Sequence, residues 1–200
     1  MDKAALDKYK KGKTPEQIKV IDYFNKDGCC LSFGLMKDED YIALVYAKRD
    51  ALKVRNTAID KIGLDEDQIN EIPPVHFEGW VYRDAFAKKN KTGTWVSSSY
   101  QVSLLFFSST QVYLYVVEFK LDASSKKEST NEFFYKDVTA FSTVSETVKA
   151  KVFGDVELEV DTIEFAMTVP GDKLRVAING TESREASIQA MKQKLREKKA

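Results

Sequence analysis

Residues 100–121 read YQVSLLFFSSTQVYLYVVEFKL, two apolar runs that meet at the short polar break 108–110. Runs this rich in β-branched and aromatic residues are typical of β-strands, and so short a break indicates a hairpin. After the polar segment 123–131, a third run, EFFYKDVTAFST, occupies 132–143. The sequence therefore predicts an antiparallel sheet at the centre of the fold, and no catalytic motif lies within these three runs.

The strand-like period continues on both sides of this stretch, beginning after the double proline at 73–74. Apolar and polar residues alternate most clearly at 100–106 and 163–169. The connections between the runs are short, which favours consecutive antiparallel hairpins over βαβ crossovers. We expect a curved meander, a sandwich or a partly open barrel. The expected strands lie near 76–86, 94–107, 111–121, 132–143, 147–153, 156–160, 162–169 and 173–179.

The residues before the double proline have a helical period instead. Thr14 is a suitable N-cap for a helix near 14–26, and Pro15 suits its first position. Gln17 stands three residues after Thr14, the spacing of a capping box, in which the two residues satisfy each other's backbone N–H groups. The sequence thus predicts a well-defined start for this helix.

A second helical pattern predicts one helix over 38–62, which Gly63 would end. An amphipathic, lysine-rich helix near 182–199 follows the last expected strand. The predicted fold class is therefore α+β, with an N-terminal helical segment at 1–75 and an antiparallel β-domain with its C-terminal helix at 76–200.

Composition excludes some classes of partner and compartment. The 200 residues include 31 basic and 31 acidic side chains, so no global field attracts nucleic acid, and we expect no nucleic-acid partner. The first residues lack the apolar core of a secretory signal, and no run approaches the roughly 20 apolar residues that span a bilayer. The only cysteines, Cys29 and Cys30, are adjacent, which favours a reducing, cytoplasmic setting.

One segment gives the chain a family resemblance. The order strand, tight turn, strand, loop and then Phe134-Tyr135-Lys136-Asp137-Val138 is similar to the core of bacterial proteins with a pleckstrin-homology-like domain. The resemblance covers roughly 76–199. It implies two curved sheets packed nearly at right angles, a β-sandwich or partly open barrel whose open corner is capped by the C-terminal helix. The helical segment before it would be an addition specific to an uncharacterised bacterial family.

Three lysines are the candidate ligand-binding residues. Lys88, Lys89 and Lys91 lie in the loop between the first two expected strands, where lipid-reading members of the resembled class carry the basic residues that contact an inositol phosphate. Those members add a further cation on the next strand, and residues 95–99 offer none. A possible anionic-ligand site and a solvated hairpin tip therefore both remain as interpretations.

Other polar residues are better explained by structure than by catalysis. His76 is the only histidine, so neither a catalytic triad nor a histidine metal cluster is supported. Cys29 and Cys30 are expected to be reduced core residues rather than a redox pair. Asp137 is expected to satisfy backbone donors at a bend. Three carboxylates share one face of a strand, which suits either a hard cation or solvent: Glu157, Glu159 and Asp161.

These observations favour a non-enzymatic binding or scaffold protein with no catalytic residue, metal or cofactor. The expected partner is a protein, bound through a sheet edge, an exposed groove or the helical segment. The alternative is recognition of anionic lipid at a membrane surface through the loop after the first strand. The sequence leaves the oligomeric state open.

Overall fold

The computed structural model describes residues 3–25, 35–63, 74–152 and 158–179. It also describes five residues near the end of the chain, Gln189, Lys192, Gln193, Arg196 and Glu197, all with helical backbone. The rest of the helix expected near 182–199 lies outside the described residues, as do Cys29 and Cys30. In the described part of the chain, no helix is long and apolar enough to cross a membrane.

The protein is α+β, with its helices ahead of its strands. The helices are α1 (Lys3–Lys10), α2 (Pro15–Asn25), α3 (Asp38–Ala51) and α4 (Val54–Ile62), with a 3-10 turn, η1 (Tyr135–Asp137), between two strands. The strands are β1 (Val75–Val81), β2 (Ala87–Lys89), β3 (Trp95–Ser97), β4 (Ser99–Phe107), β5 (Gln111–Lys120), β6 (Lys126–Phe134), β7 (Ala140–Ala150), β8 (Leu158–Val169) and β9 (Asp172–Ala177).

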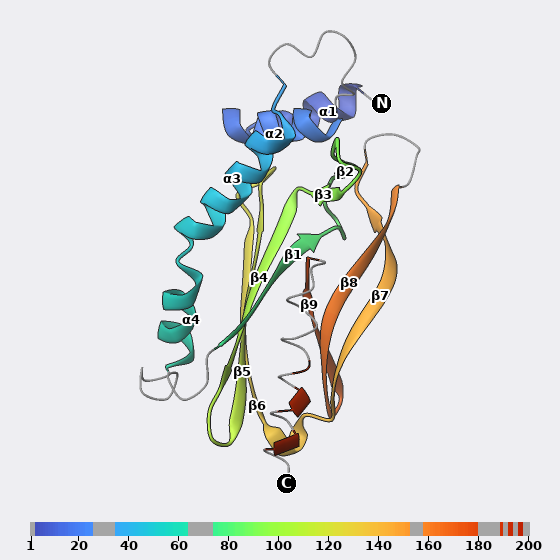
Figure 1. Ribbon diagram of the computed structural model, residues 1–200. Helices are drawn as coiled ribbons and strands as arrows, with labels where there is room; N and C mark the ends of the chain where they lie inside the picture. Colours follow the sequence, from blue (N-terminus) through green and yellow to red (C-terminus); the bar gives the residue numbers. More distant parts are fainter. Residues whose placement is uncertain are drawn as a thin grey trace.

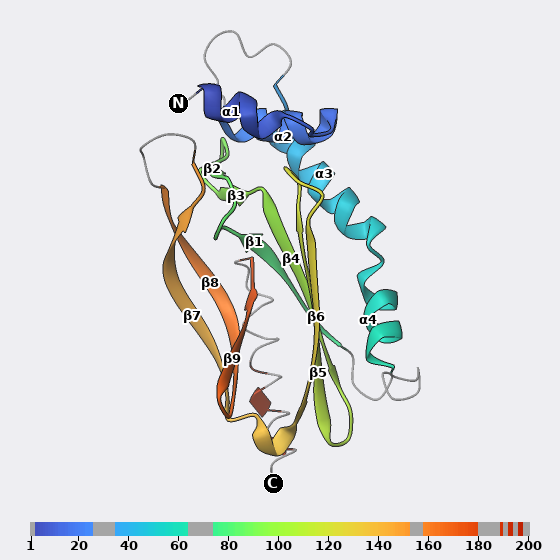
Figure 2. The same ribbon diagram turned by 180° about the vertical axis from the view of Figure 1, so that it is seen from behind.

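The strands form two main sheets and one small hairpin. The first sheet has the order β1-β4-β5-β6, the second has the order β7-β8-β9, and β2 pairs with β3 alone. All of these strands pair antiparallel, as the short connections predict. Helices α3 and α4 run along one side of the first sheet, the second sheet lies on the other side, and α1 and α2 cross one end (Figures 1 and 2).

Strand β4 is buried on both faces because it lies in the middle layer. Its even-numbered residues pack with α2, α3 and α4, whereas its odd-numbered residues Leu105 and Phe107 pack with the second sheet. Successive residues of this strand therefore point to opposite faces, as the predicted alternation requires, and both faces carry apolar residues. The even-numbered set is Tyr100, Val102, Leu104 and Phe106.

The two main sheets approach closely at Gly79 of β1. A Cβ atom at this position would lie 2.8 Å from the backbone nitrogen of Ile178 and 2.9 Å from the carbonyl carbon of Ala177. The end of β9 therefore crosses directly over β1, and only a residue without a side chain leaves room for it. Phe77, two residues earlier on the same face, stacks on Phe165 of β8 with 4.9 Å between ring centroids.

The predicted capping box at the start of α2 is confirmed. The Gln17 N–H donates to Thr14 Oγ1 at 3.2 Å, and the Thr14 N–H donates to Gln17 Oε1 at 3.0 Å. The amide of Gln17 also donates to Ser124 Oγ, which lies in the turn before β6. One residue therefore both starts α2 and attaches it to the sheet.

Several expected strand bounds are wrong in the second half of the chain. The polar segment expected as a loop forms most of β6, which is an edge strand with mostly exposed side chains. The expected strand over 132–143 is interrupted by η1. The single strand β8 takes the place of the two strands expected at 156–160 and 162–169. An edge strand needs no apolar face of its own, so its polar sequence resembled that of a loop.

The structure has two helices where the sequence predicts one over 38–62. The break lies at Lys53, whose φ of 45° and ψ of 48° place it in the left-handed region. The expected end of the helix at Gly63 is confirmed, since Gly63 has a φ of 73° and its N–H donates to the Ile59 carbonyl. Both helices pack on the first sheet, and the break redirects α4 along it.

Replacing Lys53 by glycine is expected to raise the free energy of unfolding by about 1 kcal/mol, because glycine adopts the left-handed conformation without the Cβ penalty. The matched control is Lys19→Gly, at an exposed position inside α2, where glycine should lower stability by about 1 kcal/mol. Urea unfolding measures both. A loss of stability in the Lys53→Gly variant would contradict this explanation of the break.

Candidate functional site

A groove runs along the outer side of α3, between this helix and the β2–β3 hairpin. One hollow of about 480 Å³ lies between the first turns of α3 and the hairpin tip. A second, of about 420 Å³, continues past Trp80 and Trp95 to β8 and to the residues after β9. The two hollows share Ile42, Tyr46 and Asn90. We call the joined hollow the aromatic groove.

The first turn of α3 fixes the hairpin that forms one wall of the aromatic groove. The backbone N–H of Lys91 donates to Asp38 Oδ2 at 2.8 Å, and the Tyr23 hydroxyl donates to Asp38 Oδ1 at 2.8 Å. Burial opposes the charge of Asp38, but these two hydrogen bonds, together with the nearby charges of Lys88 and Lys91, lower the pKa of the carboxyl below its ordinary value. Asp38 is therefore an anion that attaches α3 to the hairpin.

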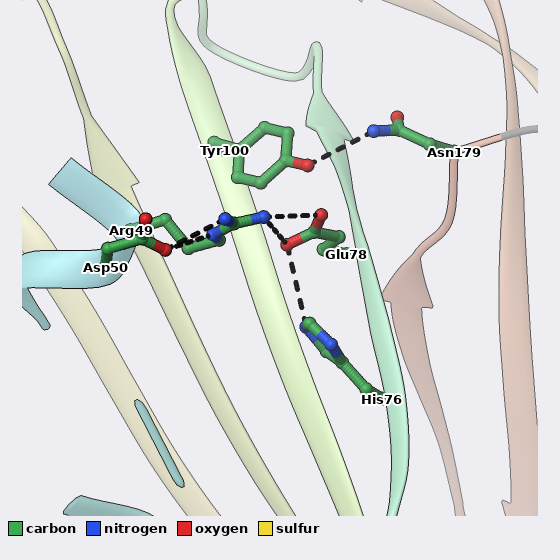
Figure 3. A network of polar contacts seen from close by, with 6 residues as sticks. All are labelled: Arg49, Asp50, His76, Glu78, Tyr100 and Asn179. Atoms are coloured by element: carbon green, nitrogen blue, oxygen red, sulfur yellow. Dashed lines mark hydrogen bonds and ion pairs between the residues drawn. The ribbon is translucent and has the colours of Figure 1, made fainter. Parts of the chain in front are cut away.

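A polar network fixes α3 and the end of β9 on opposite sides of β1 (Figure 3). Arg49 Nη1 donates to Glu78 Oε1 at 3.0 Å, which attaches α3 to β1. Asn179 donates through its backbone N–H to the Glu78 carbonyl at 2.8 Å and through its amide to the Tyr100 hydroxyl at 3.2 Å. His76 Nε2 lies 3.5 Å from Glu78 Oε2 at the edge of this network.

The electrostatics of this network keep Arg49 charged and Tyr100 neutral. Burial disfavours the charge of Arg49, but its hydrogen bonds to Asp50 and Glu78 outweigh burial and raise the pKa of the guanidinium. Burial and the neighbouring Glu78 carboxylate raise the pKa of Tyr100 well above its usual value. The network therefore fixes α3 and the residues after β9, both of which line the groove.

Two large hydrophobic side chains are exposed among the residues that line the aromatic groove. Tyr46 is 40% exposed and Ile163 is 39% exposed, and both line it. They are two of the three large hydrophobic side chains that are exposed in the described part of the chain; the third, Phe134, lies outside the groove at the end of β6. Exposed apolar residues gathered in one hollow are typical of a binding surface.

Two other hollows lie outside the aromatic groove. One of about 530 Å³ between the two main sheets is lined by charged residues that pair with one another: Glu146 accepts from Arg175 Nη1 at 2.7 Å and from Arg83 Nη2 at 2.9 Å. Another, of about 610 Å³, lies at the break between α3 and α4. Neither hollow includes Tyr46 or Ile163.

The structure separates the three lysines that the sequence singles out. Lys88 is half-buried: its ammonium donates to the Tyr23 carbonyl at 2.8 Å and lies 3.4 Å from the centroid of the Tyr23 ring. Lys89 is exposed, with its ammonium 5.2 Å from the centroid of Trp95. Lys91 is exposed at the hairpin tip and lines the aromatic groove. Lys88 therefore attaches the hairpin to α2, whereas Lys91 lines the groove and Lys89 lies over the ring of Trp95.

The remaining sequence candidates are dispersed. Asp137 lies in η1, and His76 is half exposed on β1 beside Glu78. Asp161 lies on β8 and lines the aromatic groove, where its carboxylate accepts a hydrogen bond from Thr147 Oγ1 at 2.7 Å. Glu157 lies outside the described residues. Within the described ranges, no three histidine, cysteine or acidic residues are grouped so that they could hold a metal ion.

Sequence reasoning missed most of the aromatic groove, because its residues come from segments far apart in the chain. Tyr46 lies on α3, Trp80 on β1, Trp95 on β3 and Ile163 on β8. One signal was present: Ile42 and Tyr46 are four residues apart on α3, which places both on one helical face. This face points to the groove and not only to the sheet.

The fold and the site together define a class: an α+β protein with a three-layer core and a partly apolar surface groove. Comparison of the sequence with protein-family models gives no match. Comparisons with curated proteins and with solved structures give no match either. The functional assignment therefore depends on the geometry of the groove.

Proposed function

We propose that the protein is a non-enzymatic, cytoplasmic binding module that holds a segment of a partner protein in the aromatic groove. The observation that carries the proposal is the exposure of Tyr46 and Ile163 within one continuous hollow. Large aromatic and aliphatic anchors surrounded by polar residues are the usual centre of a protein–protein contact. The fixed positions of α3 and the hairpin favour such a contact, because elements that are already ordered lose little conformational entropy on binding.

We also propose that the β-domain has a pleckstrin-homology-like fold. A four-stranded antiparallel sheet followed in the chain by a three-stranded one supports this assignment. The close crossing of β9 over β1 at Gly79 supports it as well, since packing at a steep angle brings two sheets nearest at one point. Folds of this kind serve unrelated functions, so the fold adds nothing to the choice of ligand.

Selection of peptides from a random display library tests the binding role. We expect enriched peptides whose affinity falls at least about 30-fold in a Tyr46→Ala variant, the loss typical of a hot-spot residue. Ile163→Ala should weaken the same peptides. The matched control is Phe134→Ala, which removes an exposed aromatic side chain outside the groove and should leave the affinity unchanged.

Two outcomes would overturn the proposal. One is a library that yields no specific peptide, or peptides that bind the Tyr46→Ala and wild-type proteins equally. The other comes from co-sedimentation with anionic vesicles: salt-sensitive vesicle binding that is lost when the exposed Lys89 and Lys91 are changed to alanine, with Lys88 kept to hold the hairpin, would assign the hairpin to lipid recognition instead.

A further inference from the structure

Strand β8 is paired along almost its whole length on one side only. On that side, β7 pairs with residues 158–168. On the other side, β9 pairs with residues 164–169 alone, and one longer bond follows, from the Ile178 N–H to the Ile163 carbonyl at 3.4 Å. No strand in the described part of the chain pairs with residues 158–162 on the β9 side. The first half of β8 therefore has an open edge.

The open edge exists because the end of β9 turns from β8 to the first sheet. The Ala177 N–H donates to Gln101 Oε1 at 2.7 Å, and the Asn179 N–H donates to the Glu78 carbonyl at 2.8 Å. Gln101 lies on β4 and Glu78 on β1. These two bonds hold the end of β9 on the first sheet, so that it does not continue along β8.

The backbone groups at the open edge have the pattern that a further strand requires. Successive residues of an antiparallel strand direct their N–H and C=O groups to opposite sides. The Ile163 carbonyl bonds toward β9, so Glu159 and Asp161 direct their backbone groups to the same side, whereas Val160 and Thr162 bond toward β7. Both Glu159 and Asp161 are exposed. Their N–H donors and C=O acceptors therefore alternate along the edge without a neighbouring strand.

The open edge lies at the aromatic groove. Asp161 and Ile163 line the hollow of about 420 Å³, together with Asn179, where the chain has left β8. Ile163 is 39% exposed there, and Tyr46 lines the same hollow from α3. The site thus offers a ligand main-chain hydrogen bonds beside two large apolar side chains. This combination is complementary to an extended backbone with apolar residues.

We propose, on the basis of the protein-binding role above, that the partner segment binds in an extended conformation as an added strand on the open edge of β8. Its main chain exchanges hydrogen bonds with Glu159 and Asp161. About five residues are needed to pair with the edge as far as Ile163. An apolar residue of the segment stands opposite Ile163, on the same face of the sheet, and extends toward Tyr46. The main chain supplies affinity and the apolar residue supplies specificity.

Hydrogen exchange of the β8 amides tests the open edge itself. In the free protein, the N–H groups of Glu159 and Asp161 should exchange with solvent at least about ten-fold faster than those of Val160 and Thr162, which are bonded to β7. A bound peptide selected from the display library should slow exchange at Glu159 and Asp161 about ten-fold and leave Val160 and Thr162 unchanged. Spectra of the ¹⁵N-labelled protein in D₂O measure all four rates.

Two results of this experiment would overturn the added strand. One is equal exchange at the two pairs of amides in the free protein, because the edge would then not be open. The other is slower exchange at Glu159 and Asp161 as the concentration of the protein rises without peptide, which would assign the edge to a second copy of the chain.

Backbone N-methylation of a selected peptide tests the conformation of the ligand, because each methyl group removes one N–H and leaves every side chain in place. In an added strand, every second N–H points to β8. Methylation at these positions should weaken binding about ten-fold, whereas methylation at the intervening positions, the matched control, should change it less than about two-fold. A helical ligand would lose affinity at most positions instead, since its N–H groups bond within the helix.

The two measurements separate this inference from the proposed function. Peptides that depend on Tyr46, show the alternating effect of methylation and slow exchange at Glu159 and Asp161 support both. Peptides that depend on Tyr46 but show neither effect would overturn the added strand while the binding role stands. An absence of any peptide that depends on Tyr46 would overturn the binding role, and the added strand with it.

Discussion

Replacing Gly79 by alanine is expected to lower the free energy of unfolding by about 3 kcal/mol, because the added methyl group would overlap the backbone of the crossing chain. The nearest atoms, 2.8–2.9 Å from the new Cβ, are the nitrogen and carbonyl carbon of Ile178 and the carbonyl carbon of Ala177. These are backbone atoms that cannot rotate away, so the two sheets must separate to relieve the overlap. Urea-induced unfolding, followed by circular dichroism, measures the loss.

Gly93 provides the control for this substitution. It lies at the tip of the β2–β3 hairpin with a φ of 82°, and nothing lies within 4 Å of a Cβ placed there. Gly93→Ala should therefore cost only the penalty of a left-handed conformation, about 1 kcal/mol. If Gly79→Ala were no more destabilising than Gly93→Ala, the close crossing of β1 by the end of β9 would be wrong.

Replacing Tyr41 by alanine is expected to lower the free energy of unfolding by about 4 kcal/mol, the usual loss for a large buried aromatic residue. Tyr41 is fully buried, stacks on Tyr23 with 4.6 Å between ring centroids, and meets Phe24 edge to face. It also joins three elements, because it belongs to α3 and contacts both α2 and the first sheet. The same substitution should also weaken binding in the aromatic groove, because the ring of Tyr41 stacks on Trp80, which lines the groove.

The hydroxyl of Tyr41 gives a second, smaller effect that separates packing from hydrogen bonding. It donates to the Ser97 carbonyl at 2.5 Å. Tyr41→Phe keeps the ring and leaves that buried carbonyl without this donor, so we expect a loss of about 1–2 kcal/mol. Thermal or urea unfolding of the two variants measures both losses. Equal stability of Tyr41→Phe and Tyr41→Ala would contradict the stacking account.

Local signals in the sequence predicted the local features well. The capping box of Thr14 and Gln17 predicted the start of α2, and the alternation at 100–106 predicted β4, because both patterns depend on residues close in the chain. The α+β class followed from the change of period at the double proline. One local signal went unused: an isolated glycine inside a strand pattern indicates a close backbone approach, and Gly79 has that place in β1.

Features that depend on tertiary packing were not accessible in this way. The left-handed conformation of Lys53 has no local cause in the sequence, since lysine is a good helix former. The polar sequence of β6 predicts a loop, because an edge strand does not need the apolar alternation on which strand prediction depends. The aromatic groove unites α3, β1, β3 and β8, and only the fold shows that Tyr46 and Ile163 are exposed in the same hollow.

The indole N–H signals of Trp80 and Trp95 in a ¹H–¹⁵N correlation spectrum test the central claim most directly. The chain has two tryptophans, so the spectrum contains two such signals, assigned by Trp80→Phe and Trp95→Phe. On addition of a selected peptide, both signals should shift, and both shifts should be lost in the Tyr46→Ala variant. Unchanged indole signals at a concentration at which the selected peptide is bound would show that the aromatic groove is not the binding site.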